Sequence, residues 1–382
     1  MTFQYSEIKN EHLQFIITYY SRSGLRSSSG FIQKFISVYV LYPLFLIFYT
    51  LVILNFRYKH DTIFDFVEIF SSVSSFANLL SRKTALVVDG HLFDDIIKEI
   101  PRFWKYDLCG KNDEKNKYSA RMALCVKFIK FLWISGVVSL TFHSSAPIFV
   151  KEMSLPHACW IPGDIFAFRV IIYTLEVIFY IEVVFLLGVF DGFYLLMCTE
   201  LKIQLELLEK AVNAIEFRAD EDLTNENKCW EKLKECSRYH KFLLSVHRKL
   251  NKAFSGFFVC QYFFTVGGTC VPLFVICNES SSLTQVVEGA FIIVLANVLI
   301  AMVFIPSSLV EIEAEQLSYA IYNIDWYNAK LPKNRKFVLF WLRQTQIPLE
   351  MTGAGILKIN RPVMLQIQRL GFSVSSLLAG LT

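Results

Sequence analysis

The chain has 382 residues, of which 54% are hydrophobic and 15% aromatic, and its mean hydropathy is +0.42. This apolar content exceeds what a water-soluble protein needs to fill its core, so the composition indicates an integral membrane protein. The net charge of +4 is small, and Lys and Arg lie between apolar runs rather than in one patch, which argues against nucleic acid as a partner.

The N-terminal segment, residues 1–32, is expected to lie in the cytosol. Charged residues surround its modest apolar stretch, Phe15 to Tyr20, and no small-residue cleavage site follows an apolar core. We therefore expect no signal peptide, and the first membrane helix acts as its own insertion signal.

Seven stretches are long and apolar enough to cross the hydrocarbon core as helices, because lipid offers backbone polar groups no partner. The second and the last carry several polar residues, which are tolerated where a helix faces its neighbours or a watery cavity. The predicted spans are Phe35 to Phe56, Ile63 to Leu80, Ala123 to Val150, Ile165 to Cys198, Ala253 to Cys277, Leu283 to Leu309 and Gly353 to Leu381. The expected fold class is all-α, a polytopic seven-helix membrane protein.

The distribution of cations predicts which side of the membrane each loop occupies. With the N-terminus inside, the cytosolic loops are Ser81 to Met122, Thr199 to Lys252 and Val310 to Thr352, and they hold about 25 Lys and Arg against about three in the opposite loops. The N-terminus is therefore expected in the cytoplasm and the C-terminus outside. The sequon at Asn278 falls in the third outer loop, where both glycosylation and an unused sequon close to the bilayer remain open.

Two inner loops have apolar patterns typical of packed helices. Apolar residues recur at steps of four and three from Leu201 to Ile215, and a second set recurs from Trp230 to Leu250 among many charges. Such faces need a partner, so we predict a cytosolic helical anchor layer that continues the membrane helices. The segment from Asp220 to Lys228 is interpreted as the polar link between the two patterns.

Ionisable residues along the fourth predicted span have two open interpretations. Glu176 and Glu182 lie within this span and Asp191 lies near its inner end. A charge in the bilayer is costly and often functional, so a transporter could use these groups for ions. Pairing between helices explains Asp191 equally well, and the sequence has no visible inverted repeat of the kind found in carriers.

Motifs for catalysis or metal binding are absent from the sequence. We find no phosphate-binding loop, dinucleotide fingerprint, zinc-protease motif or nucleophile elbow, so no enzyme activity is expected. Cys229, Cys236, His240 and His247 follow one another along a single predicted helix, which cannot surround a tetrahedral ion. Neither a metal nor another cofactor is therefore expected.

The outer halves of the middle spans are rich in aromatic and small polar residues. An apolar cavity with one or two hydroxyls suits a small, poorly hydrated ligand that binds through burial. Plain helix packing explains any single one of these residues, and only the set makes a pocket plausible. The candidate ligand-binding residues are Phe66, Phe70, Ser139, Phe142, His143, Tyr173, Tyr180 and Phe291.

The last predicted span carries a narrow stripe of small and polar residues. Ser373, Ser376, Leu377 and Gly380 lie at positions i, i+3, i+4 and i+7 and so share one helix face. Close helix packing favours small residues of this kind. A polar stripe with one apolar residue is also how symmetric channels line a wet pathway that closes by dewetting.

The C-terminal fifth of the sequence resembles the insect odorant receptors. In that family a cytosolic helix with a Leu, Ala, Tyr and Trp-Tyr pattern follows the sixth span, and basic, Arg/Gln/Pro and Thr-Ala-Gly elements come next. The matching residues here are Ala314, Leu317, Ala320, Tyr322, Trp326, Tyr327, Arg335, Lys336, Arg343, Gln346, Pro348, Thr352, Gly353, Ala354 and Gly355. Phe372 to Ser375 is similar to the element in the family's last helix, although Val374 replaces the usual aromatic residue, and Asp191 resembles the Asp that closes the fourth span.

The resemblance implies an odorant-tuned subunit of a ligand-gated, non-selective cation channel, which assembles with co-receptor subunits into a heterotetramer. A small volatile organic ligand would bind in the outer half, and monovalent and divalent cations would pass through a central pore. Leu377 would be the gate, and Ser373, Ser376 and Gly380 would lie beside it. The implied anchor or interface residues are Tyr322, Trp326, Tyr327, Gln346 and Pro348.

The resemblance also implies a multi-pass protein in contact with lipid in the plasma membrane of sensory neuron dendrites. We expect four regions, which are residues 1–32, the first six spans in 33–310, the cytosolic anchor region in 311–352 and the pore-lining helix in 353–382. A G-protein-coupled chemoreceptor, a gustatory receptor relative and a secondary transporter are the alternatives. The inside N-terminus and the missing Asp-Arg-Tyr motif disfavour the first, and the missing Thr-Tyr and Gln-Phe motif disfavours the second.

Overall fold

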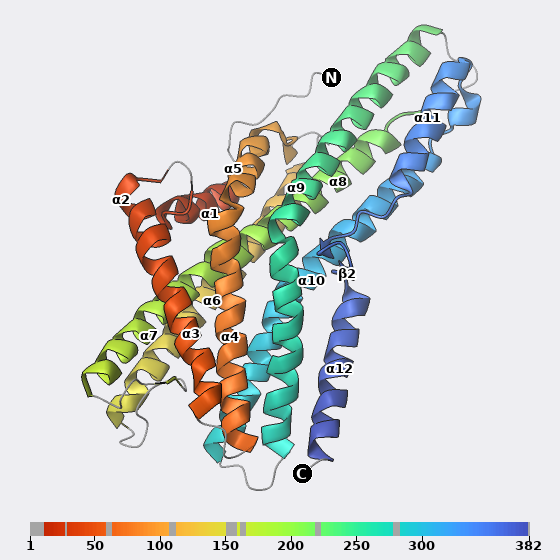
Figure 1. The fold of residues 1–382 in the computed structure, drawn as a ribbon. Coiled ribbons are helices and arrows are strands. Elements are labelled where there is room, and N and C mark those ends of the chain that lie inside the picture. The colour runs from red at the N-terminus through yellow and green to blue at the C-terminus, as the bar shows by residue number, and fades with distance from the viewer. Residues whose placement is uncertain are drawn as a thin grey trace.

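The computed structural model describes residues 11–26, 29–58, 63–106, 112–149, 159–160, 166–217, 223–277 and 283–380. Within these ranges the protein consists of helices and one two-stranded hairpin. Helix α1 lies in the upper half of the elongated bundle, and the last helix runs down to its lower end (Figure 1). These positions in opposite halves of the bundle agree with an odd number of membrane crossings.

The helices, in chain order, are α1 (Glu11–Arg22), α2 (Phe31–Lys34), α3 (Tyr42–Tyr58), α4 (Ile63–Val88), α5 (Gly90–Glu99), α6 (Asn112–Phe149), α7 (Phe166–Leu186), α8 (Gly192–Asn213), α9 (Leu223–Cys277), α10 (Leu283–Tyr322), α11 (Pro332–Thr345) and α12 (Arg361–Ala379). Two π-helical segments, η1 (Phe35–Leu41) and η5 (Leu187–Asp191), join α2 to α3 and α7 to α8. The remaining elements are the 3₁₀ turns η2 (Ile100–Arg102) and η6 (Trp326–Asn328) and the antiparallel strands β1 (Thr352–Gly353) and β2 (Leu357–Lys358).

The membrane helices follow the predicted spans closely. Among the described residues, five helices are long and apolar enough to cross a bilayer, and they overlap the first, third, fourth, fifth and sixth predicted spans. The second and last predicted spans correspond to α4 and α12, which run beside the other helices in the lower half of the bundle (Figure 1). The predicted all-α fold is confirmed, and polar residues explain the lower apolarity of these two helices.

The upper part of the bundle, here called the inner layer, contains α5, α8, α11 and the inner ends of α9 and α10 (Figure 1). The predicted apolar pattern on α8 is buried from Leu201 to Val212. The pattern on α9 is half-buried at Trp230, whereas Leu243, Val246 and Leu250 are 0–1% exposed. Both helices continue membrane helices, as the sequence predicts. The two apolar patterns therefore form the core of a helical layer outside the membrane spans.

Three sequence-based expectations differ from the structure. The last helix begins at Arg361 rather than at Gly353, because the intervening residues form the hairpin. Helix α9 begins at Leu223, so most of the predicted polar link is helical. Arg82 and Lys83, counted as loop cations, lie on α4 and are fully buried, because each meets a carboxylate of the α7–η5 helix.

Candidate functional site

One face of α12 packs against α9. Ile367, Gly371 and Ser375 lie at four-residue steps on this face and are buried. A Cβ atom on Gly371 would lie 3.0 Å from the Cβ of Thr269, so glycine permits the close approach of α12 to α9. The helix therefore has a fixed inward face and, opposite it, a face that the chain itself does not cover.

The predicted small and polar stripe of α12 lies on that uncovered face. Ser373, Ser376, Leu377 and Gly380 are exposed, with Leu377 65% exposed. Both serine hydroxyls donate to carbonyls one turn earlier, Ser373 to Arg369 at 2.9 Å and Ser376 to Phe372 at 3.0 Å. The stripe thus presents small groups and one leucine outward, in the direction in which a neighbouring chain or an aqueous path would have to lie.

The hairpin before α12 fastens that helix to α9. The Nδ2 group of Asn251 donates to the Thr352 hydroxyl at 3.2 Å, its Oδ1 accepts from the Thr352 backbone N–H at 2.7 Å, and the Ala354 N–H donates to the Ser255 hydroxyl at 2.8 Å. Ala354 and Gly355 turn the chain with φ of 50° and 72°, a region that favours glycine. The Thr-Gly-Ala-Gly sequence is therefore a docking turn rather than the start of a membrane helix.

Two side-chain contacts complete the attachment of α12. The Nε2 group of Gln368 donates to Oδ1 of Asn297 on α10 at 2.6 Å. At the hairpin, Lys358 pairs with Glu350 at 2.6 Å, and this hydrogen bond raises the pKa of the lysine. The last helix is thus attached at its base and along one side, while its opposite face stays exposed.

Three candidate ligand-binding residues take part in contacts between helices or lie half-buried on them. The Phe70 ring on α4 lies against α9, 2.9 Å from where a Cβ on Gly267 would be. The Tyr173 hydroxyl on α7 donates to the Ser144 carbonyl on α6 at 2.5 Å. Tyr180, on the same helix as Tyr173, is half-buried.

The other candidate ligand-binding residues are not all turned toward the interior. Ser139 is half-buried on α6, whereas the Phe291 ring on α10 is 48% exposed. Phe66, Phe142 and His143 lie on α4 and α6, but their side chains are outside the described part of the structure, and Asn278 is outside the described residues. The described side chains therefore link α4 to α9 and α6 to α7, and Phe291 is the most exposed of them.

An aromatic cluster on α3, α4 and α7 was missed by the sequence analysis. Phe45 and Phe48 of α3 meet Phe179 of α7 at ring-centroid distances of 4.6 and 5.2 Å, and Phe48 meets Phe76 of α4 at 5.0 Å. All four rings are buried. The outer half is the lower part of the bundle in Figure 1, where α3, α4 and α7 run together. The first membrane helix therefore contributes buried rings to this half, although no residue of that helix was predicted to line the pocket.

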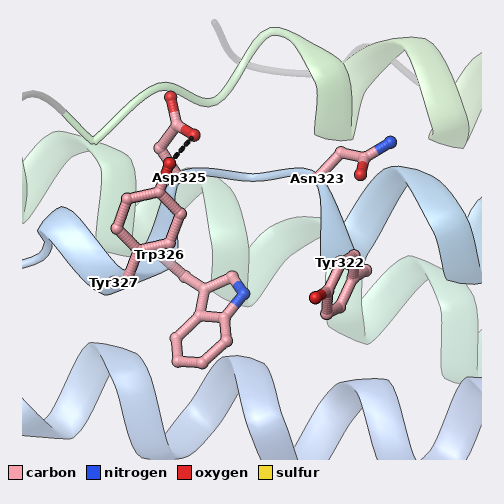
Figure 2. Close-up of a pocket in the computed structure, with 5 residues that line it drawn as sticks. All are labelled: Tyr322, Asn323, Asp325, Trp326 and Tyr327. Atoms are coloured by element: carbon pink, nitrogen blue, oxygen red, sulfur yellow. Dashed lines mark hydrogen bonds between the residues drawn. The ribbon is translucent and has the colours of Figure 1, made fainter.

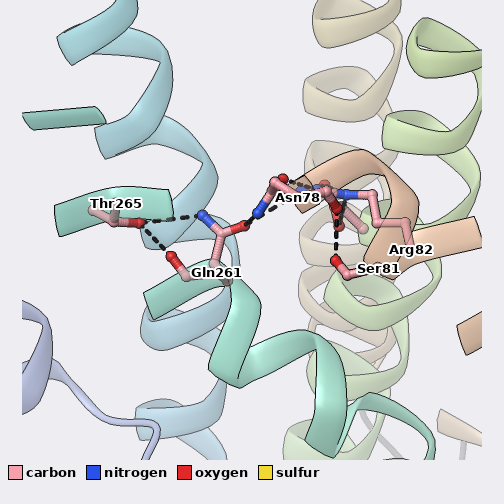
Figure 3. A network of polar contacts seen from close by, with 6 residues as sticks. Asn78, Ser81, Arg82, Gln261 and Thr265 are labelled. Atoms are coloured by element: carbon pink, nitrogen blue, oxygen red, sulfur yellow. Dashed lines mark hydrogen bonds and ion pairs between the residues drawn. The ribbon is translucent and has the colours of Figure 1, made fainter. Parts of the chain in front are cut away.

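Buried ion pairs join α4 to the α7–η5 helix, so Asp191 takes the interhelical pairing that the sequence left open, with a cation that had been assigned to a loop. Arg82 binds Asp191 at 2.9 Å with both side chains at most 2% exposed, and Lys83 binds Glu182 at 2.5 Å. Arg82 lies beside Asn78 and Ser81 in the polar network of Figure 3. The signal that could have found these pairs is the presence of two carboxylates in an apolar span, which require cations from a neighbouring helix.

The cysteine and histidine residues of α9 lie along one helix, as the sequence predicts. Cys236, His240 and His247 are buried, and the Trp341 indole N–H of α11 donates to Nδ1 of His240 at 3.2 Å. Among the described residues no group of His, Cys, Asp and Glu is arranged to hold a metal ion. His240 instead joins α9 to α11 within the inner layer.

The predicted anchor residues lie on the surface of the inner layer. Tyr322, Trp326 and Tyr327, with Asn323 and Asp325, line a pocket of about 190 Å³ where α10 turns into η6 (Figure 2). Tyr322 and Tyr327 are 62% and 63% exposed, and the Tyr327 hydroxyl donates to Asp325 at 2.8 Å. Gln346 and Pro348, just after α11, are exposed as well. A single chain therefore leaves the two tyrosines uncovered, whereas Trp326 is half-buried against the core.

Comparison with known proteins identifies the family of this chain. The sequence profile described as 7tm Odorant receptor matches residues 62–371. The chain belongs to the insect odorant receptor family. The curated odorant receptor Or2 of Anopheles gambiae is 21% identical over 315 residues, which cover 79% of this chain and 80% of that protein.

Solved receptor structures share the fold of this odorant receptor. The insect olfactory receptor OR5 from Machilis hrabei superposes with a TM-score of 0.77 at 15% identity, covering 98% of this chain and all of that one. The same receptor in complex with eugenol gives a TM-score of 0.75 at 14% identity, with 98% of each chain covered. The resemblance at the C-terminus thus extends to the whole fold.

Proposed function

We propose that this odorant receptor is the odorant-binding subunit of a ligand-gated, non-selective cation channel. The observation that carries the proposal is the orientation of α12, whose small and polar stripe faces away from the chain's own bundle while its opposite face packs on α9. A helix fixed in this way can line a pathway shared with neighbouring chains. Membership of the odorant receptor family supplies the chemical context, which is the detection of small volatile molecules.

The proposed odorant pocket lies in the outer half of the bundle among α4, α6, α7 and α10. Its candidate residues are Phe66, Phe70, Ser139, Phe142, His143, Tyr173, Tyr180 and Phe291. Aromatic rings with a few hydroxyls favour a small apolar ligand through burial and dispersion, with a hydroxyl to orient it. A receptor of the same fold has been solved in complex with eugenol, which supports a small organic ligand here.

The proposed pore is lined by Ser373, Ser376 and Gly380, with Leu377 as the apolar gate. Exposed hydroxyls give water and cations a polar surface, and a ring of leucines from several chains would close the path by dewetting. No charged side chain lies within this stripe, so monovalent and divalent cations would pass with little discrimination. Odorant binding opens the pore only if the ligand binds the open arrangement more tightly than the closed one.

The proposed partners are co-receptor subunits in a heterotetramer within the plasma membrane of sensory neuron dendrites. Two exposed tyrosines beside the half-buried Trp326 support this assembly, because Tyr and Trp side chains are typical anchors of protein interfaces. Tyr322, Trp326 and Tyr327 are the proposed contact residues, together with Gln346 and Pro348.

Co-expression with an insect odorant co-receptor in a cell that lacks insect G proteins tests the proposal. Esters, alcohols, aldehydes and eugenol, applied singly, should include one that evokes a fast cation current. Absence of current from every compound, with the receptor present at the cell surface, would contradict the channel function. Current that requires added G protein would indicate a coupled receptor, and ion-driven uptake of the compound would indicate a carrier.

A further inference from the structure

A buried hydrogen bond between two amides joins α4 to α9 in the middle of the molecule. The Nδ2 group of Asn78 donates to Oε1 of Gln261 at 2.9 Å, and the two residues are 3% and 0% exposed. The Nε2 group of Gln261 donates to the Thr265 hydroxyl at 3.3 Å, one turn further along α9 (Figure 3). The pair, here called the amide tie, is therefore a direct, buried contact between the two helices.

Arg82 contacts both residues of the amide tie and also forms the ion pair with Asp191. Its guanidinium binds Asp191 of η5, donates to the Asn78 side chain and reaches Oε1 of Gln261 at 3.5 Å. The same group lies 4.6 Å from the centre of the Phe257 ring on α9. Side chains of α4, η5 and α9 thus meet in one network, and a shift of any of these helices must break or exchange a contact.

The amide tie lies about two turns along α9 from the level at which α9 contacts both α4 and α12. Phe70, a candidate pocket residue, is about two turns from Asn78 on α4 and lies against Gly267 of α9. Two residues further along α9, on the opposite face of that helix, Thr269 meets Gly371 of α12. Helix α9 is therefore packed on the proposed ligand side through α4 and carries the proposed pore helix on its other side.

We propose that Asn78 and Gln261 are positioning residues that couple odorant binding to pore opening. An amide left without a partner in the low-polarity interior is unfavourable, so α4 and α9 move together or exchange one paired arrangement for another. A displacement of α4 by the ligand is thereby passed to α9 and to α12 packed on it. This coupling rests on the proposed channel function and assigns these two residues a role in it.

Substitution of each amide by leucine, separately and together, tests the coupling. The odorant is the compound among the esters, alcohols, aldehydes and eugenol that activates the wild-type receptor most potently. Gln261→Leu and Asn78→Leu should each raise its half-maximal concentration at least about fivefold, within the range of measured couplings between sites. The double variant should be little worse than the single ones, because the hydrogen bond between Asn78 and Gln261 is already lost in each of them. Single-channel conductance should stay at the wild-type value.

A swapped pair separates loss of coupling from loss of folding. Asn78→Gln combined with Gln261→Asn keeps two amides and their summed length, so it should restore sensitivity toward the wild-type value. Phe263→Leu is the matched control, because this residue is two positions from Gln261 but 66% exposed, and it should leave sensitivity unchanged.

Three outcomes would overturn the coupling role. These are unchanged sensitivity in the leucine variants with normal surface expression, additive effects in the double variant, and a failure of the swapped pair to restore sensitivity although it reaches the surface. Absence of current from the wild-type receptor would instead refute the proposed channel function, and this is seen before any variant is compared.

Discussion

The inner layer and the outer half of this receptor are held together in different ways. One continuous apolar core runs through the inner layer and includes buried residues such as Leu208, Leu243 and Trp341. The outer half has smaller separate clusters around Phe48 and around Phe264, and its helices turn many apolar side chains outward. The inner layer therefore resembles the core of a soluble domain, whereas the outer half depends on surrounding lipid and neighbouring chains.

This difference suggests where the receptor can change shape. Between helices in lipid there is no hydrophobic driving force, so their association depends on packing and a few polar contacts of modest strength. A small ligand can supply free energy comparable to those contacts, but it cannot rearrange a continuous apolar core. We therefore expect the helices of the outer half to shift when a ligand binds. The inner layer should keep its packing and hold the subunits together.

The largest expected effect is at the boundary between the two regions. Arg82→Met leaves Asp191 as a buried charge without its cation, which should destabilise the receptor by about 3–5 kcal/mol and greatly reduce its surface level. Thermal unfolding of the receptor in detergent, followed by size-exclusion chromatography, measures this loss. Arg82→Met combined with Asp191→Leu should recover much of it, because no unpaired charge remains. A stable single variant would show that the ion pair does not hold the regions together.

The next effect is expected in the uncovered face of α12. Leu377→Ala shortens the proposed gate and should raise the resting current about tenfold, the change that 1.4 kcal/mol gives in a closed–open equilibrium. Patch-clamp recording with the co-receptor measures it. Val374→Ala removes bulk from a half-buried neighbouring position and should keep the wild-type baseline. An unchanged baseline in Leu377→Ala would remove this residue from the gate.

A smaller effect is expected from filling the proposed pocket. Ser139→Phe should raise the half-maximal odorant concentration roughly fivefold, corresponding to about 1 kcal/mol of steric penalty, while surface expression stays normal. Ser135→Phe introduces the same ring one turn away at an exposed position and serves as the control. Normal dose dependence in Ser139→Phe would exclude Ser139 from the pocket.

The smallest effect is expected at the hairpin that docks α12. Ala354 has a φ of 50°, which a glycine adopts more easily, so Ala354→Gly should stabilise the receptor by less than about 1 kcal/mol. Ala211→Gly, within helix α8, should instead destabilise it by about 1 kcal/mol. The midpoints of thermal unfolding in detergent distinguish the two, and a lower midpoint for Ala354→Gly would contradict the proposed strain.

The sequence predicts the inner layer and the membrane helices well because both follow a period. The buried residues from Leu201 to Val212 on α8 recur at helical steps, and charged residues occupy several positions between them. The outward stripe of Ser373, Ser376 and Leu377 was also visible as spacing. A repeating contrast between polar and apolar residues identifies a face even when its partner is unknown.

Other parts of the site could not be predicted, because the sequence lacks the contrast that would reveal them. In the first membrane helix Phe45 is buried and Tyr39 is 67% exposed, yet both are aromatic, since lipid and protein interior are similarly apolar. Arg82 and Asp191 are 109 residues apart, and counting charges cannot tell a paired cation from one in a loop. The two-residue strands beside Gly355 are too short to show a pattern.

Helix α9 has a consequence for how such receptors diversify. Its 55 residues form one helix, about 80 Å long at 1.5 Å per residue, which passes from the inner layer through the outer half. A change in tilt at one end of so long a rod displaces the other end by several ångström. Substitutions that change how the inner end of α9 packs should therefore also change odorant sensitivity, so the inner layer and the ligand-binding half do not evolve independently.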